Sequence, residues 1–220
     1  MSRTISRIKA VLFDLDGTFA DTAPDLARAV NIMRAARNLS PVAEDATRPV
    51  TSHGARGLLA AGFGMTPEHP DYATMRQEFL DLYARDLCVD TCLFPGMPEL
   101  LSGLEARGIK WGIVTNKAER FAKPLMERLE PGGRCACVVG GDTTSRTKPQ
   151  PEPLLEASRL IGIAPEASVY VGDDRRDVEA GRAAGMMTIA VRYGYLNGSD
   201  PQTWGADAVV DAPEDVLAYL

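Results

Sequence analysis

Five short apolar runs alternate with helix-like segments along most of the chain. The runs are rich in β-branched residues and cover residues 9–14, 110–115, 137–140, 168–172 and 187–191. From residue 97 onward, the segments between them repeat apolar residues with helical spacing, and several end at a glycine. Short apolar strands that alternate with helices are typical of a parallel sheet buried on both faces. The pattern therefore predicts a doubly wound, Rossmann-like α/β domain.

One long stretch breaks the alternation. Residues 20–93 contain helical patterns such as PDLARAVNIMRAARN and DYATMRQEFLDLYARDL, but no convincing strand. Pro95 and Gly96 mark the return to the α/β pattern, and the first crossing lies around residues 19–22. We therefore predict an α/β core of residues 1–19 and 94–220 with an inserted helical cap of residues 20–93. Two crossings favour a lid that closes over the sheet.

Composition limits the partners of the chain. It is 220 residues long and 45% hydrophobic, and because no apolar run approaches about 18 residues, we expect no membrane span. The formal net charge of −6 gives no electrostatic reason to expect nucleic acid. The basic N-terminal stretch leads into an apolar run that is too short for a signal peptide. We expect a cytoplasmic protein that acts on a small molecule, and the sequence leaves open whether it is a monomer or a homodimer.

Polar residues follow the ends of the predicted strands. They are Asp14 and Asp16, Thr115 and Asn116, Lys148, and Asp173, Asp174 and Asp177. Loops at the carboxyl ends of parallel strands meet in one crevice, so we expect these side chains to form one site. Carboxylates from two strands are oxygen ligands of the kind that Mg²⁺ prefers. The sequence therefore predicts Mg²⁺ as the cofactor.

Four motifs carry a resemblance to a known family. DLDGT, VTN, KPQP and VGDDRRD, in this order, resemble the motifs of the haloacid dehalogenase superfamily, and the inserted helices resemble its helical cap. Within that family, FDLDGTFADTAPDL, GMPELL and VRYGY resemble phosphoglycolate phosphatases. The segments SHGARGLL and WGADAVVD are closer to N-acetylmuramic acid 6-phosphate phosphatases. One departure is Phe19, where the family usually has leucine.

The resemblance implies a phosphomonoester hydrolase that works through an aspartyl phosphate. Asp14 would be the nucleophile, and Asp16 would act first as general acid and then as general base. Mg²⁺ would bind the Asp14 side chain, the Asp16 backbone carbonyl and Asp173. The Thr115 hydroxyl, the Asn116 backbone N–H and the Lys148 ammonium would bind the phosphate.

Other candidate residues have two readings each. Asp177 would support the metal ligands or orient a lysine, or it would face solvent on a helix. Asp174 would support the ligands or cap a helix. In the cap, Arg56 lies in the glycine-rich SHGARG segment and could grip a substrate carboxylate with two hydrogen bonds. His53 is the second candidate there, and its other reading is a structural or solvent-facing residue. This segment would be either the specificity loop or a simple connection between helices.

The resemblance leaves several activities to compare. Asp16 argues against a dehalogenase, because a halide leaving group needs no acid. No lysine lies between Thr18 and Ile109, so the cap lysine of phosphonate hydrolases, and the one typical of sugar phosphomutases, is missing. We expect hydrolysis of a small carboxylated phosphate ester, either 2-phosphoglycolate to glycolate or N-acetylmuramic acid 6-phosphate. A sugar phosphomutase of the same fold and a non-catalytic phosphometabolite-binding protein are the alternatives.

Overall fold

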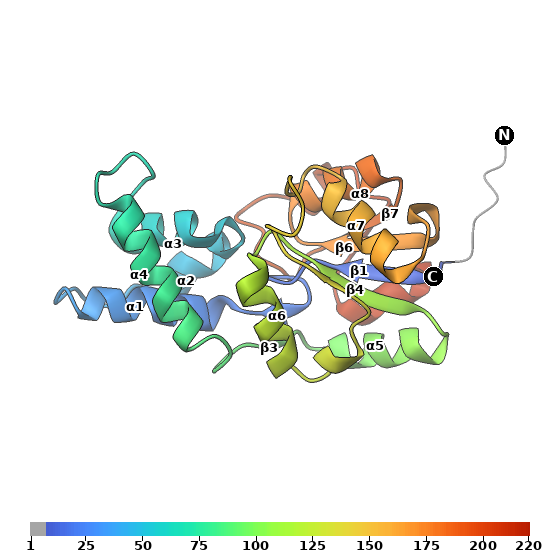
Figure 1. Ribbon diagram of the computed structural model, residues 1–220, viewed down its shortest axis with the longest axis horizontal. Helices are drawn as coiled ribbons and strands as arrows, with labels where there is room; N and C mark the ends of the chain where they lie inside the picture. The colour runs from blue at the N-terminus through green and yellow to red at the C-terminus, as the bar shows by residue number, and fades with distance from the viewer. Residues whose placement is uncertain (1–7) are drawn as a thin grey trace.

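A six-stranded parallel sheet forms the centre of the protein (Figure 1). The computed structural model describes residues 8–220. The strand order is β5-β4-β1-β6-β7-β8, and every neighbouring pair is parallel. The strands are β1 (Ala10–Phe13), β4 (Lys110–Val114), β5 (Val138–Val139), β6 (Ser168–Gly172), β7 (Met187–Val191) and β8 (Ala208–Val210). The predicted doubly wound α/β fold is confirmed.

Helices cover both faces of the sheet. These are α5 (Met97–Ala106), α6 (Glu119–Arg128), α7 (Glu152–Ile161) and α8 (Arg175–Ala184). In β1, Val11 and Phe13 belong to one buried apolar cluster, and Ala10 and Leu12 belong to a second cluster with residues of α7 and α8. Successive side chains of a strand point to opposite faces, so an uninterrupted apolar run is what a sheet covered on both sides requires.

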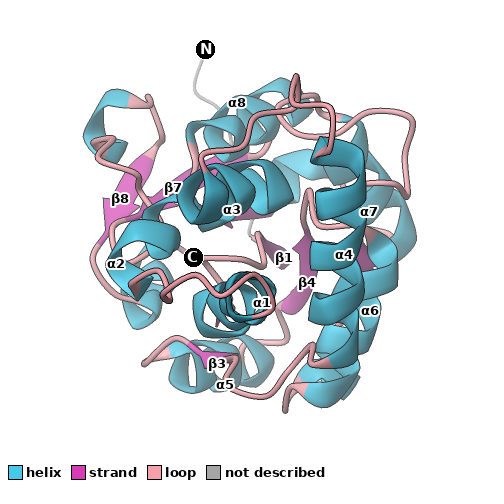
Figure 2. Ribbon diagram, turned by 90° about the vertical axis from the view of Figure 1, so that its left-hand side faces the viewer, coloured by secondary structure: helices cyan, strands magenta, loops and turns pink. Residues whose placement is uncertain are grey.

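Four helices lie together beyond the carboxyl end of the sheet, as Figure 2 shows from their side. They are α1 (Ala23–Ala35), α2 (Glu44–Thr47), α3 (Gly54–Phe63) and α4 (Tyr72–Arg85), with a 3₁₀ helix at Arg48–His53. Helix α1 packs against α3 and α4. We call residues 20–93 the cap. These are the boundaries predicted from the sequence, and we propose them as the limits of the inserted domain. None of the helices in the described chain has the length and apolar character needed to cross a bilayer.

The two crossings between cap and core are held by a short antiparallel pair that sequence reasoning did not predict. Strands β2 (Ala20–Asp21) and β3 (Cys92–Leu93) each have only two residues, too few to produce a periodic pattern. Tyr195 fixes the first crossing from the core. Its hydroxyl accepts the N–H groups of Thr22 and Ala23, and it donates to Asp21 Oδ1 at 2.7 Å.

Candidate active site

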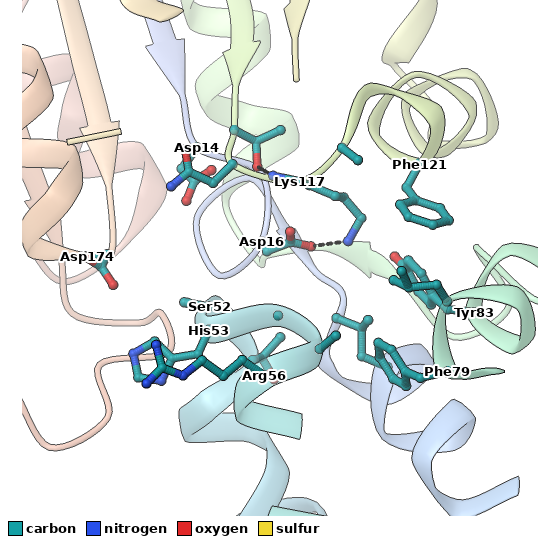
Figure 3. Close-up of a pocket in the computed structure, with 18 of the residues that line it drawn as sticks. Asp14, Asp16, Ser52, His53, Arg56, Phe79, Tyr83, Lys117, Phe121 and Asp174 are labelled. Carbon is teal, nitrogen blue, oxygen red and sulfur yellow. Dashed lines mark hydrogen bonds and ion pairs between the residues drawn. The ribbon is translucent and has the colours of Figure 1, made fainter. Parts of the chain in front are cut away.

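The predicted site residues come together at the carboxyl end of the sheet. Strand β1 lies between β4 and β6, so the residues that follow these three strands are neighbours. A cavity of about 390 Å³ opens there between the core and the cap. Its lining includes Asp14, Asp16, His53, Arg56, Thr115, Asn116, Lys148, Asp174 and Asp177 (Figure 3). Asp173 is fully buried next to them.

Three buried carboxylates lie close enough to share one cation. An oxygen of Asp14, of Asp173 and of Asp177 all lie within 4.8 Å of one another. Burial, together with the charges of Asp14 and Asp177, holds the pKa of Asp173 well above its usual range. Burial raises the pKa of Asp177 to about 6, against the opposing effect of Lys148. Buried like charges of this kind need compensation, and three carboxylates are a donor set that suits a hard divalent cation.

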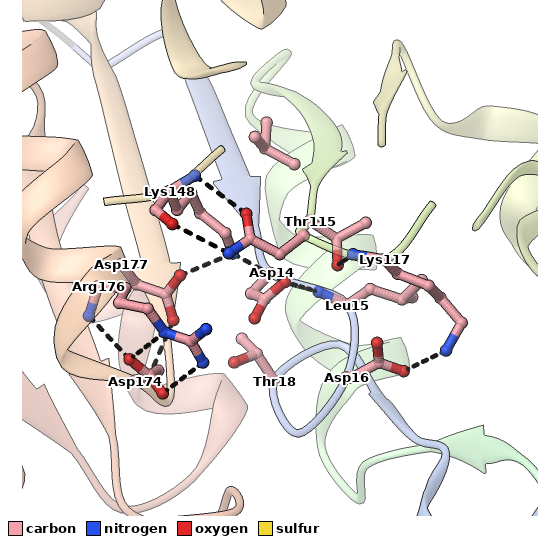
Figure 4. A network of polar contacts seen from close by, with 12 residues as sticks. Asp14, Leu15, Asp16, Thr18, Thr115, Lys117, Lys148, Asp174, Arg176 and Asp177 are labelled. Carbon is pink, nitrogen blue, oxygen red and sulfur yellow. Dashed lines mark hydrogen bonds and ion pairs between the residues drawn. The ribbon is translucent and has the colours of Figure 1, made fainter. Parts of the chain in front are cut away.

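Lys148 supplies part of that compensation. Its side chain is 2% exposed, and its ammonium lies 3.0 Å from Asp14 Oδ1 and 2.7 Å from Asp177 Oδ1. Burial alone would lower the pKa of Lys148, but the two carboxylates raise it, so the ammonium stays charged. Asn116 braces this lysine from the next loop, because its side-chain amide bonds to both the N–H and the carbonyl of Lys148 at 3.0 Å. The network is drawn in Figure 4.

Asp14 is oriented by contacts to one of its two oxygens. The Leu15 N–H donates to Asp14 Oδ1 at 2.7 Å, and Lys148 approaches the same atom. Oδ2 is thereby left as the oxygen that can face a substrate.

Gly17 makes room on the other side of the loop. Its φ is +89°, and a Cβ there would lie 2.2 Å from an oxygen of Asp173, so only glycine fits.

Asp173 is held from both sides of the site. Thr18, the threonine of DLDGT, donates its hydroxyl to Oδ1 at 3.0 Å. The Tyr195 N–H donates to Oδ2 at 2.8 Å, and the cap residue Ser52 approaches the same oxygen at 3.4 Å. These donors hold the carboxylate in one orientation toward Asp14.

The two remaining aspartates of VGDDRRD have separate tasks. Asp174 caps α8 by accepting the Arg176 N–H, and Asp177 completes a capping box by accepting the Asp174 N–H at 3.0 Å. Asp174 thus caps the helix, and Asp177 contacts Lys148. Support of the metal ligands by either residue stays a prediction. Arg176 pairs with Asp174 and also donates to the Ser52 carbonyl at 3.0 Å, which joins core and cap.

A lysine that sequence reasoning missed reaches the general-acid candidate. Lys117 Nζ lies 2.9 Å from Asp16 Oδ1, and the Thr22 hydroxyl donates to the same oxygen at 2.6 Å. The side chain of Asp16 therefore points away from the three clustered carboxylates. The available signal was position alone, because Lys117 directly follows the VTN motif.

The cap side of the cavity is basic and aromatic. Arg56 and Arg76 line it from α3 and α4, together with Phe79 and Tyr83, and no cap carboxylate of the described chain does so. A loop was one of the two forms expected for the segment that holds His53 and Arg56, but these residues do not lie in a loop. They lie where the 3₁₀ helix ends and α3 begins, with Gly54 at φ +57° between them.

Comparison with known proteins identifies the family of this chain. The family model described as haloacid dehalogenase-like hydrolase matches residues 11–191. The chain belongs to this family. The resemblance inferred from the four motifs is confirmed, and with it the expected fold and the expected enzyme class, a phosphatase of the haloacid dehalogenase type.

Named relatives are similar over nearly the full chain. An N-acetylmuramic acid 6-phosphate phosphatase of Pseudomonas aeruginosa is 48% identical over 97% of this chain and 95% of that protein. A phosphoglycolate phosphatase of Xanthomonas campestris pv. campestris is 45% identical over 93% of each. The crystal structure of a predicted phosphoglycolate phosphatase from Haemophilus somnus superposes with a TM-score of 0.84, at 26% identity, over 96% of this chain and 97% of that one.

Proposed function

We propose that this enzyme is a Mg²⁺-dependent phosphomonoesterase whose substrate is N-acetylmuramic acid 6-phosphate. One observation carries the proposal: a cavity of about 390 Å³ has the aspartates at one end and an arginine-lined aromatic wall at the other. That volume falls in the range of roughly 300–1,000 Å³ that is usual for sites of drug-sized ligands. It suits a sugar phosphate, whereas 2-phosphoglycolate would leave most of the cavity unfilled.

The chemistry of the donor set supports Mg²⁺. Asp14 and Asp173 would hold the ion together with the backbone carbonyl of Asp16, and it would neutralise charge on the phosphate when bound. Asp177 would not be a ligand, because Lys148 and the Asp174 N–H occupy its two oxygens.

Two proton transfers follow from the positions of the aspartates. Asp14 Oδ2 bonds to phosphorus while the bond from phosphorus to the sugar oxygen breaks, and Asp16 gives its proton to that oxygen. A water molecule then attacks the aspartyl phosphate, Asp16 takes a proton from it, and inorganic phosphate leaves Asp14. Lys148 lies beside Asp14 throughout and, with Thr115 and the Asn116 N–H, would stabilise the charge of the transferring group.

The cap side suits a second anionic group. Arg56 and Arg76 extend from cap helices that line the cavity, and Arg120 lines it from α6. Guanidinium groups bind carboxylates through two parallel hydrogen bonds. The lactyl carboxylate of N-acetylmuramic acid 6-phosphate lies across the sugar from the phosphate, so it could reach these arginines while the phosphate lies at Asp14. The carboxylate of 2-phosphoglycolate is next to its phosphate.

Phosphate release from the two esters tests the proposal. We expect kcat/KM to be higher for N-acetylmuramic acid 6-phosphate, activity to disappear after chelation and return with Mg²⁺, and Ca²⁺ to inhibit. Asp14→Asn provides the background rate. A preference for 2-phosphoglycolate would overturn the substrate, and full activity after exhaustive chelation would overturn the metal. Absence of turnover with any phosphate ester would favour a binding protein, and transfer of phosphate within a sugar would favour a phosphomutase.

A further inference from the structure

Lys117 bridges the core and the cap at the general-acid candidate. Its backbone is fixed to the core, because its N–H donates to Thr115 Oγ1 at 3.1 Å and its carbonyl accepts the Gly141 N–H at 2.8 Å. Its side chain, only 8% exposed, extends to the cap. There the ammonium lies 4.6 Å from the centre of the Tyr83 ring on α4. Figure 3 shows the lysine between Asp16 and Tyr83.

The two ends of Lys117 make contacts of different kinds. At Asp16 the contact is an ion pair with a hydrogen bond to Oδ1, the oxygen that also accepts from Thr22. No described residue donates to Oδ2, so this oxygen is left to carry the proton and to face the leaving group. A carboxylate with one oxygen fixed by two donors has a defined orientation for the other.

The contact with Tyr83 depends on the position of the cap. Tyr83 is 2% exposed, its ring packs against Phe121 of the core helix α6 at 5.6 Å, and its hydroxyl has no hydrogen-bond partner among residues 8–220. Burial alone would lower the pKa of Lys117, but Asp16 and Tyr83 raise it, so the lysine remains a cation below the ring. A cation this close to an aromatic face is attracted to it, more strongly when water is excluded.

We propose that Lys117 is a positioning residue for Asp16, held in place by Tyr83, so that the general acid has its working orientation only when the cap lies on the core. This inference rests on the roles proposed above for Asp14 and Asp16. In the first step Asp16 Oδ2–H protonates the sugar oxygen as its bond to phosphorus breaks. In the second step the Asp16 carboxylate accepts a proton from water. Lys117 keeps its own protons throughout and donates one hydrogen bond to Oδ1 in both steps.

Leaving groups of different basicity separate positioning from a structural role. An alkyl phosphate needs proton donation to its leaving oxygen, and p-nitrophenyl phosphate needs little. The alkyl substrate for this test is N-acetylmuramic acid 6-phosphate or 2-phosphoglycolate, depending on which of the two the enzyme hydrolyses. We expect Lys117→Met to lower kcat for it by about 10- to 100-fold, which is at most the lower end of the roughly 10²–10⁴-fold that a general acid typically contributes, because the acid itself is still present. The rate with p-nitrophenyl phosphate should change by about threefold or less. KM should change little, because Lys117 acts through Asp16.

Further variants test whether Lys117 acts through Asp16 and whether Tyr83 holds it. Adding Lys117→Met to Asp16→Asn should cause no further loss on the alkyl ester, because the group that the lysine positions has already been removed. Lys117→Arg should retain most of the alkyl activity, and Tyr83→Leu should show a smaller loss with the same substrate selectivity. Lys123→Met is the matched control, because Lys123 is a half-exposed lysine on α6 outside the cavity, and it should leave both rates unchanged.

The outcomes distinguish this inference from the proposed function. Equal losses on both substrates for Lys117→Met, no loss at all, or additive losses in the double variant would overturn the role of Lys117. If Asp16→Asn itself showed equal losses, the acid role of Asp16 would fail first. Thermal unfolding followed by circular dichroism checks each variant, and if Lys117→Met does not fold, Lys117→Arg and Tyr83→Leu decide the question by the same substrate ratio.

Discussion

Lys148 is the residue whose removal should most disturb both stability and activity. It is the ammonium that lies between Asp14 and Asp177, and all three side chains are nearly inaccessible to water. Lys148→Met keeps much of the volume but leaves the carboxylates uncompensated. Breaking a buried ion pair from one side costs about 3–5 kcal/mol. In a chain of this size that corresponds to a fall in Tm of roughly 6–20 °C.

Mg²⁺ should reverse part of this loss. Without the nearby ammonium, the carboxylates attract a cation more strongly, and an ion that binds only the folded state raises its stability. Thermal unfolding in EDTA and in Mg²⁺ should therefore show a larger Mg²⁺-induced rise in Tm for Lys148→Met than for the wild type. Phosphate release should fall by about 10²-fold or more, because the donor that we propose for the transferring phosphate would be lost. A Tm in EDTA equal to that of the Lys123→Met control, or equal Mg²⁺ shifts in variant and wild type, would show that Lys148 does not compensate the buried carboxylates.

Three further changes test other parts of the protein. Asp16→Asn should reduce hydrolysis of alkyl phosphates about 10²–10⁴-fold and that of p-nitrophenyl phosphate far less, which steady-state kinetics on both substrates would show. Arg56→Ala should lower kcat/KM for N-acetylmuramic acid 6-phosphate by roughly ten- to over a hundredfold, a loss of about 1.5–3 kcal/mol in transition-state stabilisation. It should not lower kcat/KM for p-nitrophenyl phosphate, and a uniform loss would contradict a carboxylate contact. Asp25→Ala should lower Tm by about 6 °C or more at neutral pH, because Asp25 accepts three backbone N–H groups of residues 89–91. Burial raises the pKa of Asp25, but those bonds and the one from the Thr91 hydroxyl outweigh it and hold the pKa low. The stabilisation is thus present above about pH 4 and is lost as the pH falls through the lowered pKa, so a difference in Tm that persisted in stronger acid would contradict the assignment.

The sheet could be predicted because local pattern and tertiary environment agree there. Strands β1, β4 and β6 are buried on both faces, so each had to be a continuous apolar run. Their order also placed Asp14, Thr115 and Asp173 at one edge. The edge strand β8 was missed, because three residues carry too little pattern to be distinguished from a loop.

The contacts across the cavity could not be predicted in the same way. The ammonium of Lys117 contacts the ring of Tyr83, which precedes it by 34 residues in the sequence. The two residues meet only because of the way the cap is placed on the core. A pattern of helical periodicity says that α4 buries one face, but it does not say which core side chain that face meets. Arg176 is a similar case, since its bond to the Ser52 carbonyl exists only because the cap rests on α8.

The charges of the site explain why two aspartates could stand so close together after the first strand. Lys148 approaches Asp177 most closely, so these two groups neutralise each other in their buried surroundings. Asp14 and Asp173 then remain as two carboxylates whose charge no described side chain fully offsets. Burial, and after it the charges of Asp14 and Asp177, raises the pKa of Asp173. Asp16 does not add to it, because Lys117 pairs with it on the cap side. The remaining deficit is two negative charges on hard oxygen ligands, which is the charge and the donor type that one Mg²⁺ ion balances.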